Sequence, residues 1–335
     1  MKGLKTAPIL AAVFLFSLPA LSAAKDADWS AIRAASVTMF YPGAASWDFL
    51  TSDNHRLGGH EIKQTKKDCR HCHLSKAGEL DLQADEIAAG ALKMKRTHEP
   101  FEPEPIPGKK GVMHANVQAA YDTESIYIRV EWEGKGAAWQ SKNSEAPPDR
   151  VSIQLNKTEP AFKKYGCFTT CHNDLNTMPG SPSKKEVRGN PYYAALDRDD
   201  VRLYAFYAKE TWNAKRDEKE LEKRLKNGGL IDLWSLELSG GAVKSLDGWI
   251  FDDRQWEAKS DIEGRGGWAN GKYSVVFKRR LKTGGTNDIQ LGEGDTVSAG
   301  LAIHDDGASK RRHYVSFPFT IGLNADADIK AENIK

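Results

Sequence analysis

"VQAAYDTESIYIRVEW", residues 117–132, is the stretch that decides the fold. Two short apolar runs flank the polar sequence "DTES", which has the composition of a tight turn. In the second run every other side chain is apolar and falls on one face: Ile126, Ile128, Val130 and Trp132. A period of two residues is typical of a strand with one buried face, so this stretch predicts a β-hairpin.

Further strands are predicted after this hairpin. Five runs have alternating or β-branched residues: 150–156, 201–208, 273–281, 296–303 and 313–323. Many short strands separated by turn residues predict a mainly β protein with an antiparallel β-sandwich, which we place at residues 109–325. The charged run 217–229 predicts a solvated insert, helical or disordered, and residues 326–335 are expected to form a tail.

The N-terminus has the features of a secretory signal peptide over residues 1–24. Lys2 and Lys5 form a charged start, an apolar run follows at 9–18, and small residues offer a cleavage site near Ala24. An uncleaved membrane anchor is the alternative, but the apolar run is shorter than the ~20 residues that a spanning helix needs. The sequence therefore predicts export to the periplasm.

The charges of the chain are nearly balanced, with 48 lysines and arginines against 46 aspartates and glutamates. This balance gives no reason to expect nucleic acid as a partner. No segment after the signal is apolar enough to cross a membrane, so we expect a mature chain with no transmembrane segment.

Residues 25–108 predict a smaller N-terminal segment that is mostly helical or irregular. Within it, the stretch 78–95 predicts a short helix. The prolines of the next stretch, 99–111, forbid regular hydrogen-bonded structure. We therefore expect a proline-rich linker there, with a boundary near residue 108.

The sequence "CRHCH", residues 69–73, lies in this segment and has the spacing of a c-type haem attachment site. In such a site two thiols, here Cys69 and Cys72, form thioethers with the haem vinyl groups, and the adjacent His73 binds the iron. Zinc is the competing cofactor, but one short cluster gives poor tetrahedral geometry without a second pair of ligands. The sequence therefore predicts covalently bound haem c.

The sequence "CFTTCH", residues 167–172, repeats this pattern with three residues between the cysteines instead of two. Cys167 and Cys171 would form the thioethers and His172 the proximal iron bond, with the extra residue absorbed by a bulged turn. A small disulfide loop and a chance match are the alternatives. Disulfides suit an exported chain, but they give no reason for a histidine after both cysteine pairs. We predict a second covalently bound haem c.

Each haem iron has a sixth position, for which other histidines are candidates. His55 and His60 precede the first motif closely enough to fold back over the far face of the porphyrin. We favour His55, because the apolar side chains at 47–50 would anchor its helix. The weaker candidates are Met94, His98 and His114.

Six segments of the chain resemble, in the same order, the haem-binding domain of ethylbenzene dehydrogenase and related molybdenum enzymes. They are 117–132, 149–155, 166–172, 231–237, 268–281 and 300–319, and the resemblance extends over about residues 112–323. The proteins that it resembles are the haem-carrying gamma subunits of the dimethyl-sulfoxide-reductase superfamily. The resemblance implies a β-sandwich, in agreement with the strand pattern.

The axial ligands differ from those of the proteins that the chain resembles. In the gamma subunits the haem is b-type and non-covalent, and methionine and lysine bind the iron. Here His313 stands where that lysine would be, in the stretch 304–316, and the thiol pair with His172 replaces the methionine side. The resemblance therefore implies His172 and His313 as the ligands of the second haem, with His304 as the fallback, and a dihaem member of the c-type branch of the family.

Two haems in an exported chain predict electron transfer, because histidine on both faces leaves no iron position open to a substrate. We expect a periplasmic dihaem c-type cytochrome that is not itself an enzyme. Its expected partner is a respiratory redox protein, such as a molybdoenzyme or a quinol-oxidising cytochrome. Both a free carrier and the haem subunit of a molybdoenzyme complex fit this expectation.

Two other functions stay open at this point. A haem enzyme with one open iron position would act on a small inorganic substrate. A carbohydrate-binding module would use aromatic side chains as a stacking platform, and five tryptophans are available for it: Trp139, Trp212, Trp234, Trp256 and Trp268.

Overall fold

The structure is a computed structural model whose described residues include nearly all of the predicted sandwich. The described residues are 27–41, 50, 55, 57–65, 67–92, 108–141, 147–170, 182–195, 197, 199, 208–211, 214–252, 254–305, 307–308 and 312–334. The predicted signal peptide, 1–24, lies outside them, as does the strand predicted at 201–208 apart from its last residue.

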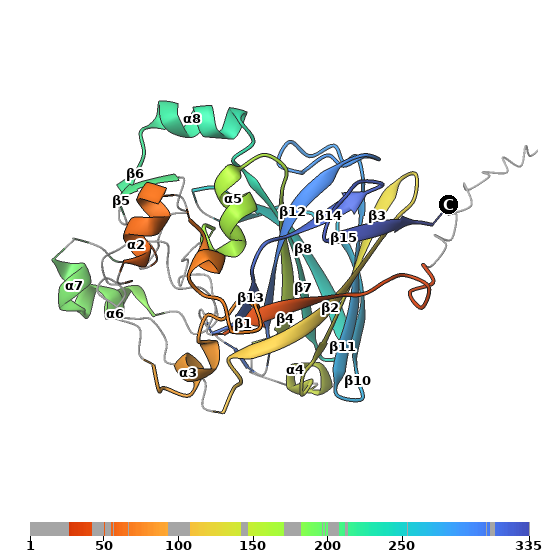
Figure 1. Cartoon of the computed structure of the whole chain (residues 1–335), viewed down its shortest axis with the longest axis horizontal. Helices are drawn as coiled ribbons and strands as arrows, with labels where there is room; N and C mark the ends of the chain where they lie inside the picture. The colour runs from red at the N-terminus through yellow and green to blue at the C-terminus, as the bar shows by residue number, and fades with distance from the viewer. Residues whose placement is uncertain are drawn as a thin grey trace, which may run out of the picture.

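A 13-stranded sheet forms the body of the molecule (Figure 1). Its strands are β1 (Ala35–Phe40), β2 (Val112–Tyr121), β3 (Ser125–Glu133), β4 (Asp149–Asn156), β7 (Ile231–Ser239), β8 (Ala242–Ile250), β9 (Arg254–Trp256), β10 (Glu263–Ala269), β11 (Lys272–Arg280), β12 (Thr296–His304), β13 (Tyr314–Ser316), β14 (Phe319–Leu323) and β15 (Ile329–Asn333). The order is β10-β11-β3-β2-β1-β13-β12-β4-β7-β8-β9, with β14 joining β12 to β15 and β15 joining β2. All neighbours are antiparallel except β14–β15 and β15–β2. β5 (Lys209–Thr211) and β6 (Ala214–Lys215) form a separate small pair.

The predicted hairpin at 117–132 is present as β2 and β3. The carboxylate of Asp122 accepts hydrogen bonds from the backbone N–H groups of Glu124 (2.8 Å) and Ser125 (2.7 Å), which closes the turn. Asn270 and Gly271 make the turn between β10 and β11, both with positive φ, as a two-residue turn between twisted strands requires.

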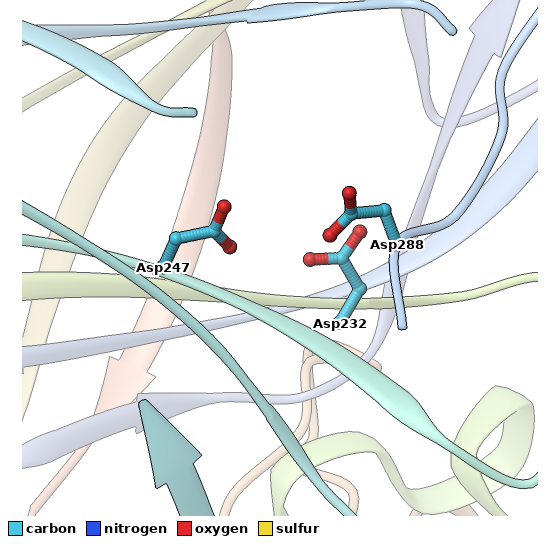
Figure 2. A group of neighbouring side chains, drawn as sticks. All are labelled: Asp232, Asp247 and Asp288. Atoms are coloured by element: carbon cyan, nitrogen blue, oxygen red, sulfur yellow. The ribbon is translucent and has the colours of Figure 1, made fainter. Parts of the chain in front are cut away.

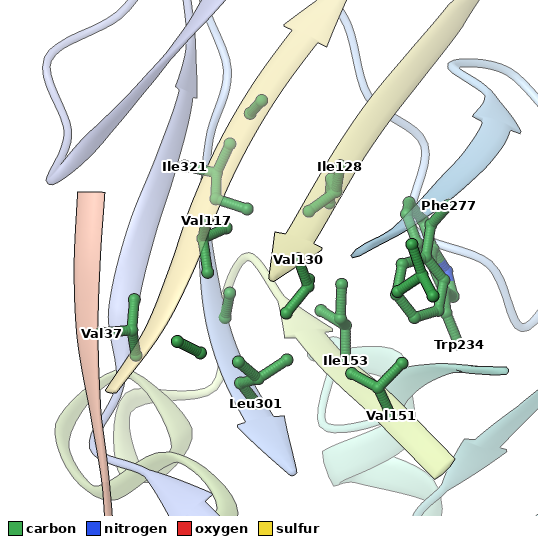
Figure 3. Close-up of a cluster of buried hydrophobic side chains, with 14 of the residues drawn as sticks. Val37, Val117, Ile128, Val130, Val151, Ile153, Trp234, Phe277, Leu301 and Ile321 are labelled. Atoms are coloured by element: carbon green, nitrogen blue, oxygen red, sulfur yellow. The ribbon is translucent and has the colours of Figure 1, made fainter. Parts of the chain in front are cut away.

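The core lies where the sheet folds over on itself and two sets of strands face each other. Side chains of β2, β3 and β11 meet those of β4, β7 and β12, as Figure 3 shows. Six of these side chains are at most 1% exposed: Val117, Ile128, Phe277, Ile153, Trp234 and Leu301. Two sheet faces packed on one core make a sandwich, so the expectation of a mainly β, antiparallel fold is confirmed.

The structure differs from the sequence prediction at both ends of the sandwich. β1 comes from the segment expected to be helical or irregular, and it pairs with β2 and β13. Its alternate residues Val37 and Met39 are buried in the main core. β15 comes from the expected tail, where Ile329 is buried in the same way. Short strands of this kind gain their stability from the strands that they join, which a local pattern does not reveal.

Short helices and turns gather at one end of the sandwich. They include α2 (Gly58–His60), η2 (Glu61–Thr65), η3 (Cys69–His71), α3 (Ala84–Ala88), α5 (Pro160–Tyr165), η4 (Gly166–Phe168), α6 (Lys184–Gly189) and α7 (Pro191–Ala194), as Figure 1 shows. α4 (Ala137–Gln140) contacts β7, and α8 (Glu218–Lys226) is the charged insert, which is helical. The helices that the structure describes are all too short or too polar to span a bilayer.

The core predicts the cost of truncating one of its side chains. Leu301 is fully buried, so Leu301→Ala is expected to lower the free energy of unfolding by about 2–5 kcal/mol, through lost burial and the cavity left behind. Leu225→Ala makes the same chemical change at a side chain that is 42% exposed, and is expected to change little. Urea unfolding followed by circular dichroism measures both, and equal effects would contradict this core assignment.

Candidate functional site

The first cysteine motif forms a compact turn. The carboxylate of Asp68 accepts from the N–H of Arg70 (2.9 Å) and begins the turn, and the N–H of His73 donates to the carbonyl of Cys69 (2.8 Å). Cys69 is buried and Cys72 is exposed. The ring of His71 is exposed and paired with the carboxylate of Asp68 (2.9 Å).

The structure brings His55 and His73 together. Their rings are nearly parallel, 6° apart, and the ring centroids are 6.0 Å apart. Two bonds of about 2 Å from imidazole nitrogens to one metal account for roughly 4 Å of such a separation, and half the width of each ring accounts for the rest. The pair therefore fits the space that an iron with two axial imidazoles needs.

Both rings are held by hydrogen bonds to the backbone. Nδ1 of His55 donates to the carbonyl of Leu50 (2.9 Å), and the ring of His73 hydrogen-bonds the backbone of Asp81. Such second contacts fix the tautomer and the direction of a metal-binding imidazole. Burial, and then the nearby His55 ring, lower the pKa of His73, so its ring is in the neutral, metal-binding form at neutral pH.

Gly58 makes room for His55. A Cβ on this glycine would come within 2.6 Å of Cε1 of His55, so a larger residue would displace the ring. This role was not evident from the sequence, although the glycine pair at 58–59 is a visible signal of close approach. His60 and His114 are exposed, whereas Met94 and His98 lie outside the described residues.

The second cysteine motif begins on short helices that follow β4. Glu159 and Pro160 start α5, and Gly166, with a φ of 55°, ends it and starts η4. Cys167 is buried against β12, where a Cβ at Gly300 would come within 2.6 Å of its sulfur. That Gly300 makes room for Cys167 was not evident from the sequence.

Two members of this motif, Cys171 and His172, lie outside the described residues. The last described residue of the motif is Thr170, whose hydroxyl donates to the side chain of Gln154 on β4 and to the carbonyl of Cys167 (3.2 Å). These contacts fix the start of the motif on the sandwich, as expected of a functional loop on a rigid scaffold.

One apolar cluster contains the first cysteine of both motifs. Its buried members are Leu50, Cys69, Tyr165, Cys167, Phe168, Ala302, Val315 and Phe317. The hydroxyl of Tyr165 donates to the carbonyl of Lys67 (2.7 Å), and the guanidinium of Arg70 lies 4.0 Å from the ring centre of Phe317. The segment with the first motif is thus packed against the sandwich directly beside the second motif.

The surroundings of the two buried thiols are apolar. Burial raises the pKa of Cys69 to about 11 and that of Cys167 to about 12. A thiolate is therefore disfavoured at both positions, whereas a neutral thioether suits them. Within the described residues, the side chains that converge closely enough to hold a bare metal ion are carboxylates, not Cys69, Cys72 and His73.

The two C-terminal histidine candidates lie face to face. The rings of His304 and His313 are 15° from parallel with their centroids 4.1 Å apart, too close to hold an iron between them. His304 is on β12, two residues beyond Ala302 of the apolar cluster. The residue after His304, Asp305, forms a buried ion pair with Lys109 (2.6 Å).

The tryptophans do not form a common platform among the described residues. Trp234 is fully buried, Trp139 and Trp268 pack against the main core, and Trp256 packs against a different apolar cluster. Trp212 lies outside the described residues. A sugar-binding face needs several exposed rings side by side, so these four side chains do not support one.

Two known proteins that the chain resembles over nearly its whole length are named as cytochromes. A family model described as "Ethylbenzene dehydrogenase" matches residues 26–316. The chain is 30% identical over 335 residues to cytochrome c-552 of Stutzerimonas stutzeri, covering 99% of each chain. It is 24% identical over 306 residues to cytochrome c-551 of Rhodocyclus tenuis, covering 91% of this chain and 98% of that protein. A solved family 9 carbohydrate-binding module of Caldicellulosiruptor kristjanssonii in complex with glucose matches with 8% identity, over 61% of this chain and 66% of that chain, and its TM-score of 0.25 is too low to support an argument.

Proposed function

The chain belongs to the ethylbenzene dehydrogenase family, and from this premise we propose that it is a periplasmic electron carrier with two covalently bound haem c groups. Two relatives that span almost its whole length are named cytochrome c-552 and cytochrome c-551. The single observation that carries the proposal is the parallel pair of His55 and His73 beside the first cysteine motif.

The first haem would be held by residues of one short segment. Cys69 and Cys72 would form the thioethers, and His73 and His55 would bind the iron from opposite faces. A haem iron with two imidazole ligands supplies a reversible one-electron change without a vacant position for a substrate. The arrangement of His55 therefore favours electron transfer over catalysis at this haem.

The second haem would be held by Cys167, Cys171 and His172, with His313 as the distal ligand and His304 as its alternative. Two observations support this assignment. Cys167 is buried in the apolar cluster, and the strand that leads to His304 contributes Ala302 to the same cluster. A haem is a large apolar group, and such a cluster buries it away from water.

Electrons would pass between the two haems through a short, dry region. Cys69 and Cys167 belong to one cluster, which also holds the rings of Tyr165, Phe168 and Phe317. The same contacts hold the first segment rigidly against the sandwich. A fixed, short separation between two redox centres is what a two-centre electron carrier needs.

A redox partner would approach the first haem. Cys72 is exposed, and two large apolar side chains near the motif are also exposed, Leu57 at 79% and Leu74 at 52%. Exposed apolar residues around a partly exposed redox centre suit a small and transient contact with another redox protein. A molybdoenzyme or a quinol-oxidising cytochrome is a partner of this kind.

The proposal is tested by counting haems in protein made in a host that attaches haem c. We expect two irons per chain, red colour that survives acid–acetone extraction, and a low-spin optical spectrum that carbon monoxide does not change. A count of one iron per chain would contradict the proposed second haem site. A spectrum that changes on adding carbon monoxide would favour a haem enzyme with an open iron position instead.

A further inference from the structure

Three carboxylates meet inside the sandwich, far along the chain from both cysteine motifs. Asp232 is on β7, Asp247 is on β8, and Asp288 is in the connection between β11 and β12. One oxygen of each lies within 4.8 Å of the others, and Figure 2 shows the three side chains pointing toward one another. Asp232 and Asp247 are diagonal neighbours of the β7–β8 ladder, which places both on the inner face.

This group is buried and its hydrogen bonding is incomplete. Asp232 is 0% exposed and Asp247 is 2% exposed, and the side chain of Asp288 is 5% exposed. Oδ2 of Asp232 accepts from Arg279 (2.5 Å) and from the N–H of Ile289 (2.9 Å). Oδ1 of Asp232 and Oδ1 of Asp247 have no hydrogen-bond partner among the described residues. A buried carboxylate oxygen without a hydrogen-bond partner destabilises the folded state. We therefore expect each of these two oxygens to have a ligand.

The charges inside the group do not balance. Arg279 is fully buried, pairs with Asp232, and lies 3.8 Å from Asp288, so it supplies one positive charge to three carboxyl groups. A divalent cation would bring the group of three carboxylates and one guanidinium to neutrality.

We propose that Asp232, Asp247 and Asp288 bind a calcium ion that stabilises the sandwich. Calcium takes carboxylate and other oxygen ligands at about 2.3–2.6 Å, so two ligands on opposite sides of the ion lie about 5 Å apart, in agreement with the observed spread. The ion would lie against the two unpartnered oxygens. Asp261 is exposed and its N–H contacts Oδ2 of Asp247 (3.3 Å), which places a further carboxylate at the surface side of the site, where an ion would enter.

The test uses the complete haem-loaded protein, dialysed against a chelator and then against calcium-free buffer. Adding calcium chloride at about a hundredfold excess over its Kd is expected to raise Tm by roughly 5 °C or more, and elemental analysis after gel filtration is expected to find one bound calcium per chain. Magnesium chloride is expected to raise Tm less, since three converging carboxylates suit the larger ion.

The variant Asp247→Asn tests whether Asp247 binds calcium or has only a structural role. This variant is expected to lose the calcium-dependent rise in Tm, yet in calcium-free buffer to be at least as stable as the wild type, because it removes a buried charge. Asp326→Asn changes a carboxylate whose side chain is 98% exposed and is expected to keep the full response. An unchanged Tm and no bound calcium in the wild type would overturn the proposal, as would an equal response in Asp247→Asn. Neither substitution changes a residue of the two cysteine motifs, so this result is independent of the electron-transfer proposal.

Discussion

Replacing His55 by alanine is expected to convert the proposed first haem from low spin to high spin. The ring of His55 lies parallel to that of His73 at the separation that an iron between them needs, so its removal opens one axial position. Carbon monoxide should then bind to about one haem per chain in the reduced protein, whereas the wild type should bind none. Optical and electron paramagnetic resonance spectra report the change.

His60→Ala is the matched control, since it removes an exposed histidine of the same short stretch. It is expected to leave the spectrum and the carbon monoxide response unchanged. His55→Met is expected to restore a low-spin haem with a raised reduction potential, because a thioether ligand favours ferrous iron. A high-spin signal in His60→Ala together with a normal spectrum in His55→Ala would assign the distal position to His60 instead.

Removing the second cysteine pair is expected to halve the haem content. In Cys167→Ala/Cys171→Ala the iron count should fall from two per chain to one, and haem staining of a denaturing gel should fall by half. Alanine is preferable to serine here, because Cys167 is buried among apolar side chains and a hydroxyl would add a polar group without a partner.

Cys69→Ala/Cys72→Ala is the complementary variant and should lose the other haem. Together the two double variants give the separate spectrum of each centre, and their sum should match the wild type. If the Cys167→Ala/Cys171→Ala protein kept two irons through acid–acetone extraction, the longer motif would not be an attachment site. A single-haem protein would then be the correct description.

Local patterns predicted the parts of the fold that depend on neighbouring residues. The alternation in 117–132 specifies a hairpin without help from the rest of the chain, whereas the hairpin around Asn270 and Gly271 was not predicted, although asparagine–glycine is a typical two-residue turn. The motif at 69–73 can also be recognised from local sequence, because two thiols and a histidine must be close in sequence to hold one haem; the attachment of haem there stays a prediction.

Contacts between segments that are far apart in the sequence are not visible as a local sequence pattern. Lys67 and Tyr165 are 98 residues apart, and the cluster that brings the two cysteine motifs together depends on contacts of this range. The role of β1 was missed for the same reason, since its pairing with β13 joins opposite ends of the chain. Asp232 did leave a signal, because an acidic residue on the otherwise apolar inner face of β7 breaks the binary pattern, and such exceptions are expected at functional positions.

The pairing of Phe40 with Val112 has a further consequence. Residues 41–111, which include the first cysteine motif, form one long connection between two adjacent strands. The pairing of β1 with β2 holds the two ends of this connection close together. The entropic cost of closing a loop rises only slowly with its length. Insertions, deletions or replacements in this connection are therefore compatible with the pairing of the strands on either side. The segment with the first cysteine motif can thus vary while the strand pairing of the sandwich, next to which the second motif begins, is kept.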